Sequence, residues 1–175
     1  MHPSFVDIEN EFDEIGQEVA RLSNRLARID SDSPFPDTQE EWEAALVCAS
    51  AAEKIYTGCE RVMARLAAEV DQSPVVHSDG WHAALLRRMA NPFPGVRGPF
   101  ISKECYGVLD KLRAFRHRER NTYGINLDFG IAVERAHEAV SGFDVFCREV
   151  RAFLGHSHKD DVGEDGAPSP GPGGR

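Results

Sequence analysis

The sequence predicts an all-α protein: a helical bundle of four long helices plus one short helix, followed by a disordered C-terminal tail. Hydrophobic residues recur every three or four positions along most of the chain, and no segment shows the alternation of a strand. After Gly155, the residues Gly, Pro, Ser, Asp and His dominate, and such a composition buries too little apolar surface to fold. We therefore expect one helical domain over residues 1–155 and a disordered, acidic, Gly/Pro-rich tail over residues 156–175.

The first two helices are expected to form a hairpin. The segment from Ser31 to Pro36 interrupts the helical pattern, and Thr38 to Glu41 has the form of a capping box that opens the second helix. Two long apolar seams joined by a short turn are typical of an αα-hairpin. The first seam contains Phe5, Ile8, Phe12, Ile15, Val19, Leu22, Leu26 and Ile29, and the second contains Trp42, Ala45, Ala49, Ala52, Tyr56, Cys59, Met63, Leu66 and Val70.

Three further helices follow. A short one is expected over residues 80–90, with Asp79 as its cap, and a longer one begins after Ser102 and stops at Gly124. The last helix is expected over Asp128 to Leu154. The inward residues are expected to be Trp81, Leu85 and Met89, then Cys105, Val108, Leu109, Leu112 and Phe115, then Val133, Ala136, Val140, Phe143, Phe146, Val150 and Phe153.

The bulk composition indicates a soluble protein. The chain has 175 residues, of which 41% are hydrophobic and 28% charged, with a net charge of -9. No apolar run approaches the roughly 20 residues that span a bilayer, and the N-terminus is acidic, unlike a secretory signal. The net charge argues against non-specific binding to long duplex nucleic acid. We expect a cytoplasmic location without membrane attachment.

The four cysteines are widely spaced and fall within the predicted helices. Because Cys48, Cys59, Cys105 and Cys147 form no C-x-x-C pair, a zinc site is not expected. The simplest interpretation is four buried, reduced thiols. Nothing in the sequence calls for a metal or another cofactor.

A dense basic cluster stands out in this acidic chain. Arg113, Arg116, His117, Arg118 and Arg120 lie within eight positions at the end of a predicted helix. On a helical projection, Arg116, with Glu119 and Tyr123, continues the apolar stripe of Leu112, whereas Arg113, Arg120, His117 and Asn121 lie to one side. Since burying a lone guanidinium is costly, this face must either pair internally, for example Arg116 with Glu119, or open into a cleft or interface.

Two interpretations of the cluster follow from its chemistry. His117 can exchange protons near neutral pH, and arginines match the geometry of a phosphate. Together they could cleave RNA through its own 2′-hydroxyl without a metal. The alternative is a solvated basic face that pairs with acidic neighbours.

A second group of polar residues precedes the short helix. His77, Ser78 and Asp79 contain the residue types of a catalytic triad, but consecutive positions rarely allow that geometry, so a loop with a helix cap is the favoured interpretation. Trp81 is interpreted as a core or interface anchor, and His82 as exposed or hydrogen-bonded.

The chain resembles the HEPN-domain proteins, specifically the HepT-like toxins of bacterial toxin–antitoxin pairs. Their motif is an Arg, four residues, a His, one residue and a Tyr, and the frame fits Arg116, Asn121 and Tyr123. The resemblance covers residues 5–155. It is carried by the segments Tyr56–Arg61, Asp71, Trp81–His82, Leu85–Met89, Pro99–Ser102, Leu112–His117 and Tyr123–Asp128.

The resemblance implies a metal-independent ribonuclease that works as a homodimer, with two motif copies facing one another. Arg116 would contact the phosphate. The charges of Arg113 and Arg120, whose role follows from arginine chemistry and not from the resemblance, would help to bind RNA. Tyr123 would be the position at which a partner nucleotidyltransferase antitoxin attaches adenylate and silences the toxin. The surplus seam residues Phe5 and Phe12 also hint at a dimer.

One position departs from the family's pattern. Asn121 stands where the family has its catalytic His, and an Asn side chain cannot exchange protons near neutral pH. Either the histidine role has moved to His117, one turn away on the same face, or the chain is a weakened or inactive module that binds RNA, a nucleotide or a partner protein. A helical adaptor with no nucleic-acid role is a third alternative. Convergence of Arg116 and Asn121 would require the helix to end or bend near Arg120, or a dimer.

Overall fold

The computed structural model describes residues 3–32, 38–121 and 127–161. Within them the chain forms five helices, which confirms the predicted all-α bundle of four long helices and one short one. In chain order they are α1 (Pro3–Asp32), α2 (Thr38–Glu69), α3 (Trp81–Ala90), α4 (Lys103–Asn121) and α5 (Phe129–Asp161).

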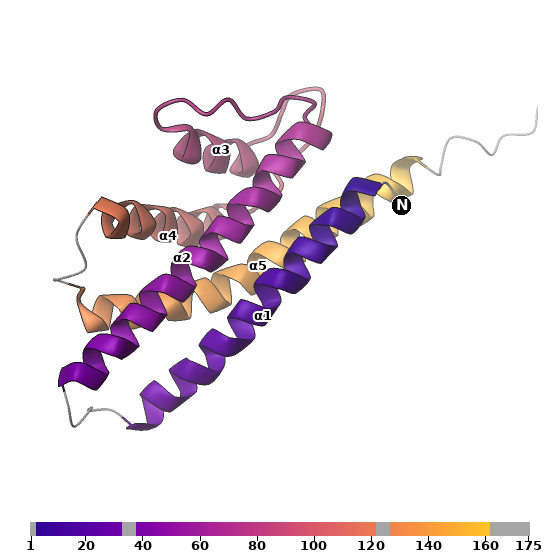
Figure 1. Ribbon diagram of the computed structural model, residues 1–175. Coiled ribbons are helices and arrows are strands. Elements are labelled where there is room, and N and C mark those ends of the chain that lie inside the picture. The colour runs from indigo at the N-terminus through magenta and orange to yellow at the C-terminus, as the bar shows by residue number, and fades with distance from the viewer. Residues whose placement is uncertain (1–2, 33–37, 122–126, 162–175) are drawn as a thin grey trace, which may run out of the picture.

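Helix α2 is the centre of the bundle, because it contacts each of the other four helices. Helices α1 and α5 run alongside it, whereas α3 and α4 pack together next to its C-terminal half (Figure 1). The buried face of α2 is therefore wider than the single predicted seam and also includes Ala44, Cys48, Ala51, Ile55 and Val62. The prediction for Trp42 was wrong: its position in the first turns of α2 leaves it 45% exposed.

The seam of α1 packs against α2, as predicted, and also against α5. Its residues from Ile8 to Ile29 are buried, and Phe12 makes edge-to-face contacts with Phe143 and Phe146 of α5. Phe5 is half-buried against the same core. Both phenylalanines are thus used within the chain, and they are not surplus positions that point to a dimer.

Close approach of α1 and α2 requires a glycine. A β-carbon built on Gly58 would collide with the side chain of Ile15. Gly58 therefore lets α1 pack closely against α2 within the segment of α2 that carries the candidate site.

The helix boundaries follow local capping chemistry. The Ser102 hydroxyl accepts a hydrogen bond from the Cys105 amide (3.1 Å), as predicted, and the Asp128 carboxylate accepts one from the Ile131 amide (2.8 Å). Asp79 is not the cap of α3: that position is Gly80, with φ 76° and no side-chain cap.

The last helix is longer than predicted. It continues to Asp161 instead of ending near Leu154. Residues 156–161, which were predicted to belong to the disordered tail, are therefore helical. The rest of that tail, residues 162–175, and the predicted helix stop at Gly124 lie outside the described residues. Among the helices the structure describes, none has the length and apolar character needed to cross a membrane.

All four cysteines are buried and unpaired with one another, in agreement with the predicted burial. Burial raises the pKa of the Cys105 and Cys147 thiols to about 12, and it also raises the pKa of Cys48 and Cys59. These thiols are therefore protonated and poorly reactive in the folded chain.

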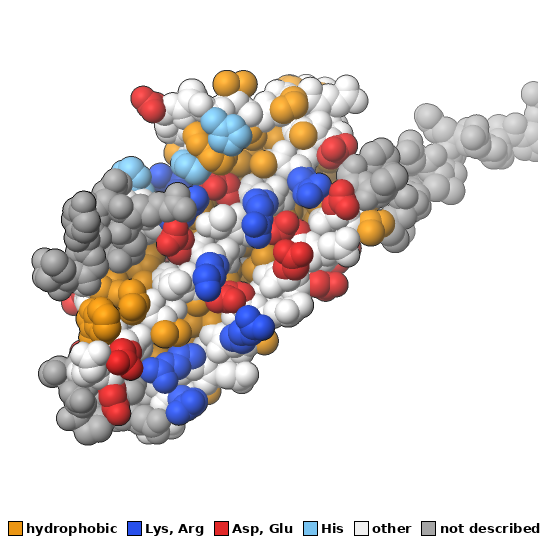
Figure 2. Space-filling model, in the orientation of Figure 1, with side chains coloured by type: hydrophobic (Ala, Val, Ile, Leu, Met, Phe, Trp, Pro, Cys, Tyr) orange, Lys and Arg blue, Asp and Glu red, His pale blue; other side chains and the backbone are white. Residues whose placement is uncertain are grey.

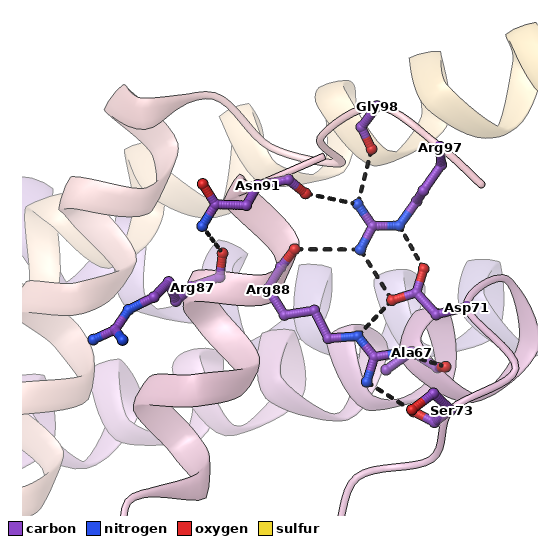
Figure 3. Close-up of polar contacts among 8 residues, drawn as sticks. All are labelled: Ala67, Asp71, Ser73, Arg87, Arg88, Asn91, Arg97 and Gly98. Carbon is purple, nitrogen blue, oxygen red and sulfur yellow. Dashed lines mark hydrogen bonds and ion pairs between the residues drawn. The ribbon is translucent and has the colours of Figure 1, made fainter. Parts of the chain in front are cut away.

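A buried carboxylate ties the end of α2 to α3 and to the following loop (Figure 3). Asp71 accepts hydrogen bonds from Nε of Arg88 (2.6 Å) and from Nε (2.5 Å) and a terminal nitrogen (3.0 Å) of Arg97. The two guanidinium groups also donate to the backbone carbonyls of Ala67, Ser73, Arg88, Asn91 and Gly98. We call these three side chains the Asp71 cluster.

The Asp71 cluster is electrostatically satisfied. Burial alone would raise the pKa of Asp71, but the hydrogen bonds from Arg97 and Arg88 outweigh it and hold the pKa below its ordinary value of 3.8. The Arg97 guanidinium also lies 3.9 Å from the centre of the Phe100 ring. The cluster therefore fixes the long α2–α4 connection onto the bundle.

Candidate functional site

Arg116 is a buried cation on the apolar face of α4, where the sequence places it. Its side chain reaches across to α2, where a terminal nitrogen donates to Glu60 Oε2 (2.8 Å) and Nε lies 3.7 Å from Glu53 Oε1. That Nε is buried without a hydrogen-bond partner. The sequence left two alternatives for this face, internal pairing or an opening into a cleft or interface, and the described partners of Arg116 are internal and come from α2. The side chain of Glu119, the partner suggested by the sequence, lies outside the described residues.

Glu60 joins three elements of the chain. This carboxylate is 6% exposed and receives Arg116 from α4, the Tyr56 hydroxyl from one turn earlier in α2 (3.4 Å) and Nδ1 of His82 from α3. Burial, and then the Glu60 charge, raise the pKa of Tyr56 above its ordinary value, so its hydroxyl stays protonated and donates. We call Glu60, Arg116, His82 and Tyr56 the Glu60 cluster.

An open pocket of about 550 Å³ adjoins the Glu60 cluster. Histidine and hydrophobic side chains lie side by side over α3 and the neighbouring end of α4, at the upper left of Figure 2. Three segments line the pocket: the loop before α3, the first turn of α3 and one face of α4. They contribute His77, Ser78, Asp79, Gly80, Trp81, His82, Ala83, Arg113 and His117.

The α3 side of the pocket is aromatic. The Trp81 ring lies between two imidazoles, with its centre 4.4 Å from the His77 ring and 3.8 Å from the His82 ring. The α4 side is basic: Arg113 and His117 lie one turn apart, and Nε of Arg113 donates to Asp110 (2.8 Å). The pocket thus combines three aromatic rings on the α3 side with basic side chains from α4.

The structure divides the sequence-predicted site residues into three groups. Arg116 is buried on Glu60, whereas Arg113 and His117 share the pocket. Arg120 and Asn121 complete α4, but their side chains lie outside the described residues, as does the whole of Tyr123. Helix α4 remains helical through Asn121, the residue after Arg120, so its geometry places Arg116 and Asn121 about 140° apart around the axis.

Sequence reasoning missed the role of Glu60 and the pocket in front of His82. The signal for Glu60 was available, because it follows Tyr56 by one turn beside the apolar seam of α2, where a lone carboxylate would be too costly to bury. His82 was interpreted as exposed or hydrogen-bonded, and it is both: its side chain is 36% exposed and contacts Glu60. No local pattern links residues 77–83 to α4.

Fold and site together define a class of protein: an all-α bundle in which a basic helix end meets a buried carboxylate of the central helix, beside a pocket. The sequence matches the family model described as HepT-like protein over residues 47–156. The chain belongs to this HepT-like family. Neither the search of curated proteins nor the search of solved structures found a match.

Proposed function

We propose that this protein is the ribonuclease toxin of a toxin–antitoxin pair and cleaves RNA without a metal. The observation that carries the proposal is the C-terminal half of α4. It contributes Arg113 and His117 to the pocket, and it directs Arg116 to Glu60, the carboxylate that His82 of the same pocket also contacts. Membership of the HepT-like family supports a toxin-like role. In this proposal Arg116 contacts the scissile phosphate, Arg113 and Arg120 hold the RNA, and the reaction takes place in the cytoplasm.

The state of Arg116 supports a site that binds an anion. One terminal nitrogen is committed to Glu60, but the buried Nε has no hydrogen-bond partner. The Glu53 carboxylate lies 3.7 Å from that Nε. In the proposal, a phosphate takes the place of a carboxylate beside Arg116 and accepts hydrogen bonds from the guanidinium.

The proposal assigns the proton-transfer role of the family's histidine to His117. This side chain is exposed, lines the pocket and lies one turn before Asn121. Asn121 then contributes hydrogen bonds instead of proton transfer. Because α4 continues as a helix through Asn121, a homodimer would bring Asn121 of one protomer towards Arg116 of the other. The exposed Trp42, Leu46 and Val47 of α2 offer apolar surface for such an association.

The proposed regulator is a nucleotidyltransferase antitoxin that attaches adenylate to Tyr123. An added adenylate at the end of α4 would place negative charge beside the basic cluster and repel RNA. The test is to express the protein with and without a neighbouring nucleotidyltransferase gene. Growth arrest that the second gene relieves, with a mass increase that Tyr123→Phe abolishes, is the expected result.

The nuclease is tested with purified protein and a single-stranded oligoribonucleotide in the presence of EDTA. We expect His117→Ala to lose about 100-fold or more in cleavage, and Asn121→Ala far less. Arg116→Ala should also abolish cleavage, whereas His137→Ala, an exposed histidine on α5, is the matched control. Equal and negligible effects of His117→Ala and Asn121→Ala would refute the relocated histidine.

The second candidate function is a non-catalytic module that binds RNA, a nucleotide or a partner protein. Asn121 in place of the family's histidine favours it, as does the engagement of Arg116 by Glu60. A chain that is harmless on expression and cleaves no RNA, yet binds the oligoribonucleotide with a salt-dependent affinity, would support this function instead.

A further inference from the structure

The pocket beside the Glu60 cluster contains a histidine that the family motif does not include. His82 begins α3, far from the motif in sequence, yet it lines the same pocket as His117 and Arg113 of α4. Its ring contacts the carboxylate that also holds Arg116. Glu60 therefore connects the motif arginine to a histidine on a different helix.

The contact with Glu60 fixes the state of the His82 ring. With Nδ1–H donated to the buried carboxylate, Nε2 is the nitrogen that remains available to a ligand in the pocket. A carboxylate behind an imidazole holds the ring in one orientation and stabilises the imidazolium that forms when Nε2 takes a proton. Such an arrangement is suited to a general base.

The remaining walls of the pocket suit one nucleotide of a single strand. Bases that are not stacked in a duplex stack on aromatic side chains, and the pocket lining includes the rings of Trp81, His77 and His82. Arg113 and His117 lie on the other side, where a phosphate would find cations. A volume of about 550 Å³ is within the usual range for a small-molecule site.

We propose that this pocket holds the RNA nucleotide at the scissile bond, and that His82, backed by Glu60, is the general base that activates its 2′-hydroxyl. The inference rests on the proposed ribonuclease function and adds a catalytic residue to it. It requires no metal or other co-reactant.

The step balances in atoms and electrons. His82 Nε2 removes the proton of the 2′-hydroxyl while that oxygen forms a bond to phosphorus. The bond from phosphorus to the 5′-oxygen of the next nucleotide breaks, and protonated His117 gives its proton to that oxygen. The products are a 2′,3′-cyclic phosphate and a 5′-hydroxyl, with the two histidines left in exchanged protonation states that solvent resets.

The main variant is His82→Gln, because a glutamine amide can still donate to Glu60 but cannot exchange protons. On a single-stranded oligoribonucleotide, kcat should fall about 100-fold or more while KM changes little. Circular dichroism and thermal unfolding verify that the variant folds, and His137→Gln, an exposed histidine on α5, is the matched control. Imidazole added to the medium should restore part of the activity of His82→Ala, which a merely structural role would not allow.

The pH profile provides an independent readout. The charged and titratable groups around His82 are Glu60 on α2, Arg113 and His117 on α4, and His77 and Asp79 in the loop before α3. In a profile of kcat against pH, the acidic limb that a general base produces should be lost in His82→Gln and retained in His137→Gln.

The outcomes separate the inference from the function on which it rests. If the wild-type chain cleaves RNA and His82→Gln cleaves equally well, His82 is not the base, and the proposed ribonuclease stands without it. If the wild-type chain cleaves no RNA, the ribonuclease itself is refuted, and the catalytic step of His82 with it. Cleavage that depends on both histidines and yields a cyclic phosphate supports the inference.

Discussion

Asp71 and Glu60 are two buried carboxylates that differ in how fully their surroundings are hydrogen-bonded. Asp71 has two arginines, and each described side-chain nitrogen of Arg88 and Arg97 donates to a carboxylate or carbonyl oxygen (Figure 3). Glu60 shares Arg116 and a histidine, and the cluster keeps one unsatisfied buried donor and one half-exposed imidazole at the edge of a pocket. A buried carboxylate paired with arginine therefore has a structural role in the Asp71 cluster and forms part of a candidate site in the Glu60 cluster.

The largest expected effect on stability comes from a substitution at Asp71. Asp71→Asn leaves the Arg97 side chain, which is 2% exposed, without its counter-charge. Removing one partner of a buried ion pair costs about 3–5 kcal/mol, so the free energy of unfolding measured in urea should fall by that order. RNA cleavage by the folded fraction should remain. The control is Asp7→Asn, whose pair with Arg65 is exposed and is expected to contribute about 0–1 kcal/mol.

Acid should weaken the Asp71 cluster. The pKa of Asp71 is below its ordinary value in the folded chain, so its charge contributes stability above the unfolded pKa, and this contribution is lost as the pH falls through the folded pKa. Unfolding free energies measured from neutral pH down to about pH 3 should therefore decline less steeply in Asp71→Asn than in wild type. An unchanged slope would show that Asp71 is not the carboxylate responsible.

Glu60→Gln should cost less stability and more activity. The amide retains the shape of the side chain and can still bond His82, but Arg116 loses its nearest charge. We expect a loss of about 1–3 kcal/mol in unfolding free energy, together with a fall in RNA cleavage larger than that of Asp71→Asn. If Asp71→Asn impairs cleavage by folded protein as severely as Glu60→Gln, the proposed division of roles is wrong.

The smallest expected effect is on the thiol next to Glu60. Burial raises the pKa of Cys59, so a thiol reagent should label it slowly in the native protein. In a chain where Cys59 is the remaining cysteine, Glu60→Gln should speed this labelling severalfold by loosening the cluster locally. Equal acceleration by Asp71→Asn would show that the two clusters open as one unit.

Much of the fold follows from local patterns, but the site does not. The seam from Ile8 to Ile29 and the Ser102 cap depend on residues three or four positions apart, which a sequence displays directly. Trp42 was wrongly predicted to be buried. Its exposure depends on how far the neighbouring helices extend, and the periodicity of hydrophobic residues carries no information about their length. Asp79 failed as a cap because Gly80 adopts the left-handed conformation at that point.

The candidate site was only half accessible to sequence reasoning. The placement of Arg116 on a buried stripe followed from the helical projection, as did the shared face of Arg113 and His117. The contact of Glu60 with His82 depends on how α3 folds back onto α2, and that path is set by the long connection and by Asp71. A contact between segments far apart in the sequence produces no local spacing pattern from which it could be predicted.

Glu60 of α2 and Asp71, just after α2, have a joint consequence for the register of α3. Leu85, Leu86 and Met89 are hydrophobic side chains that could slide along an apolar groove at modest cost. His82, near the start of α3, and Arg88, near its end, each meet a separate carboxylate. A shift of one residue would part both pairs at once, so charge selects one alignment of α3 where shape alone would tolerate several, and it holds the imidazole of His82 at a defined place beside α4.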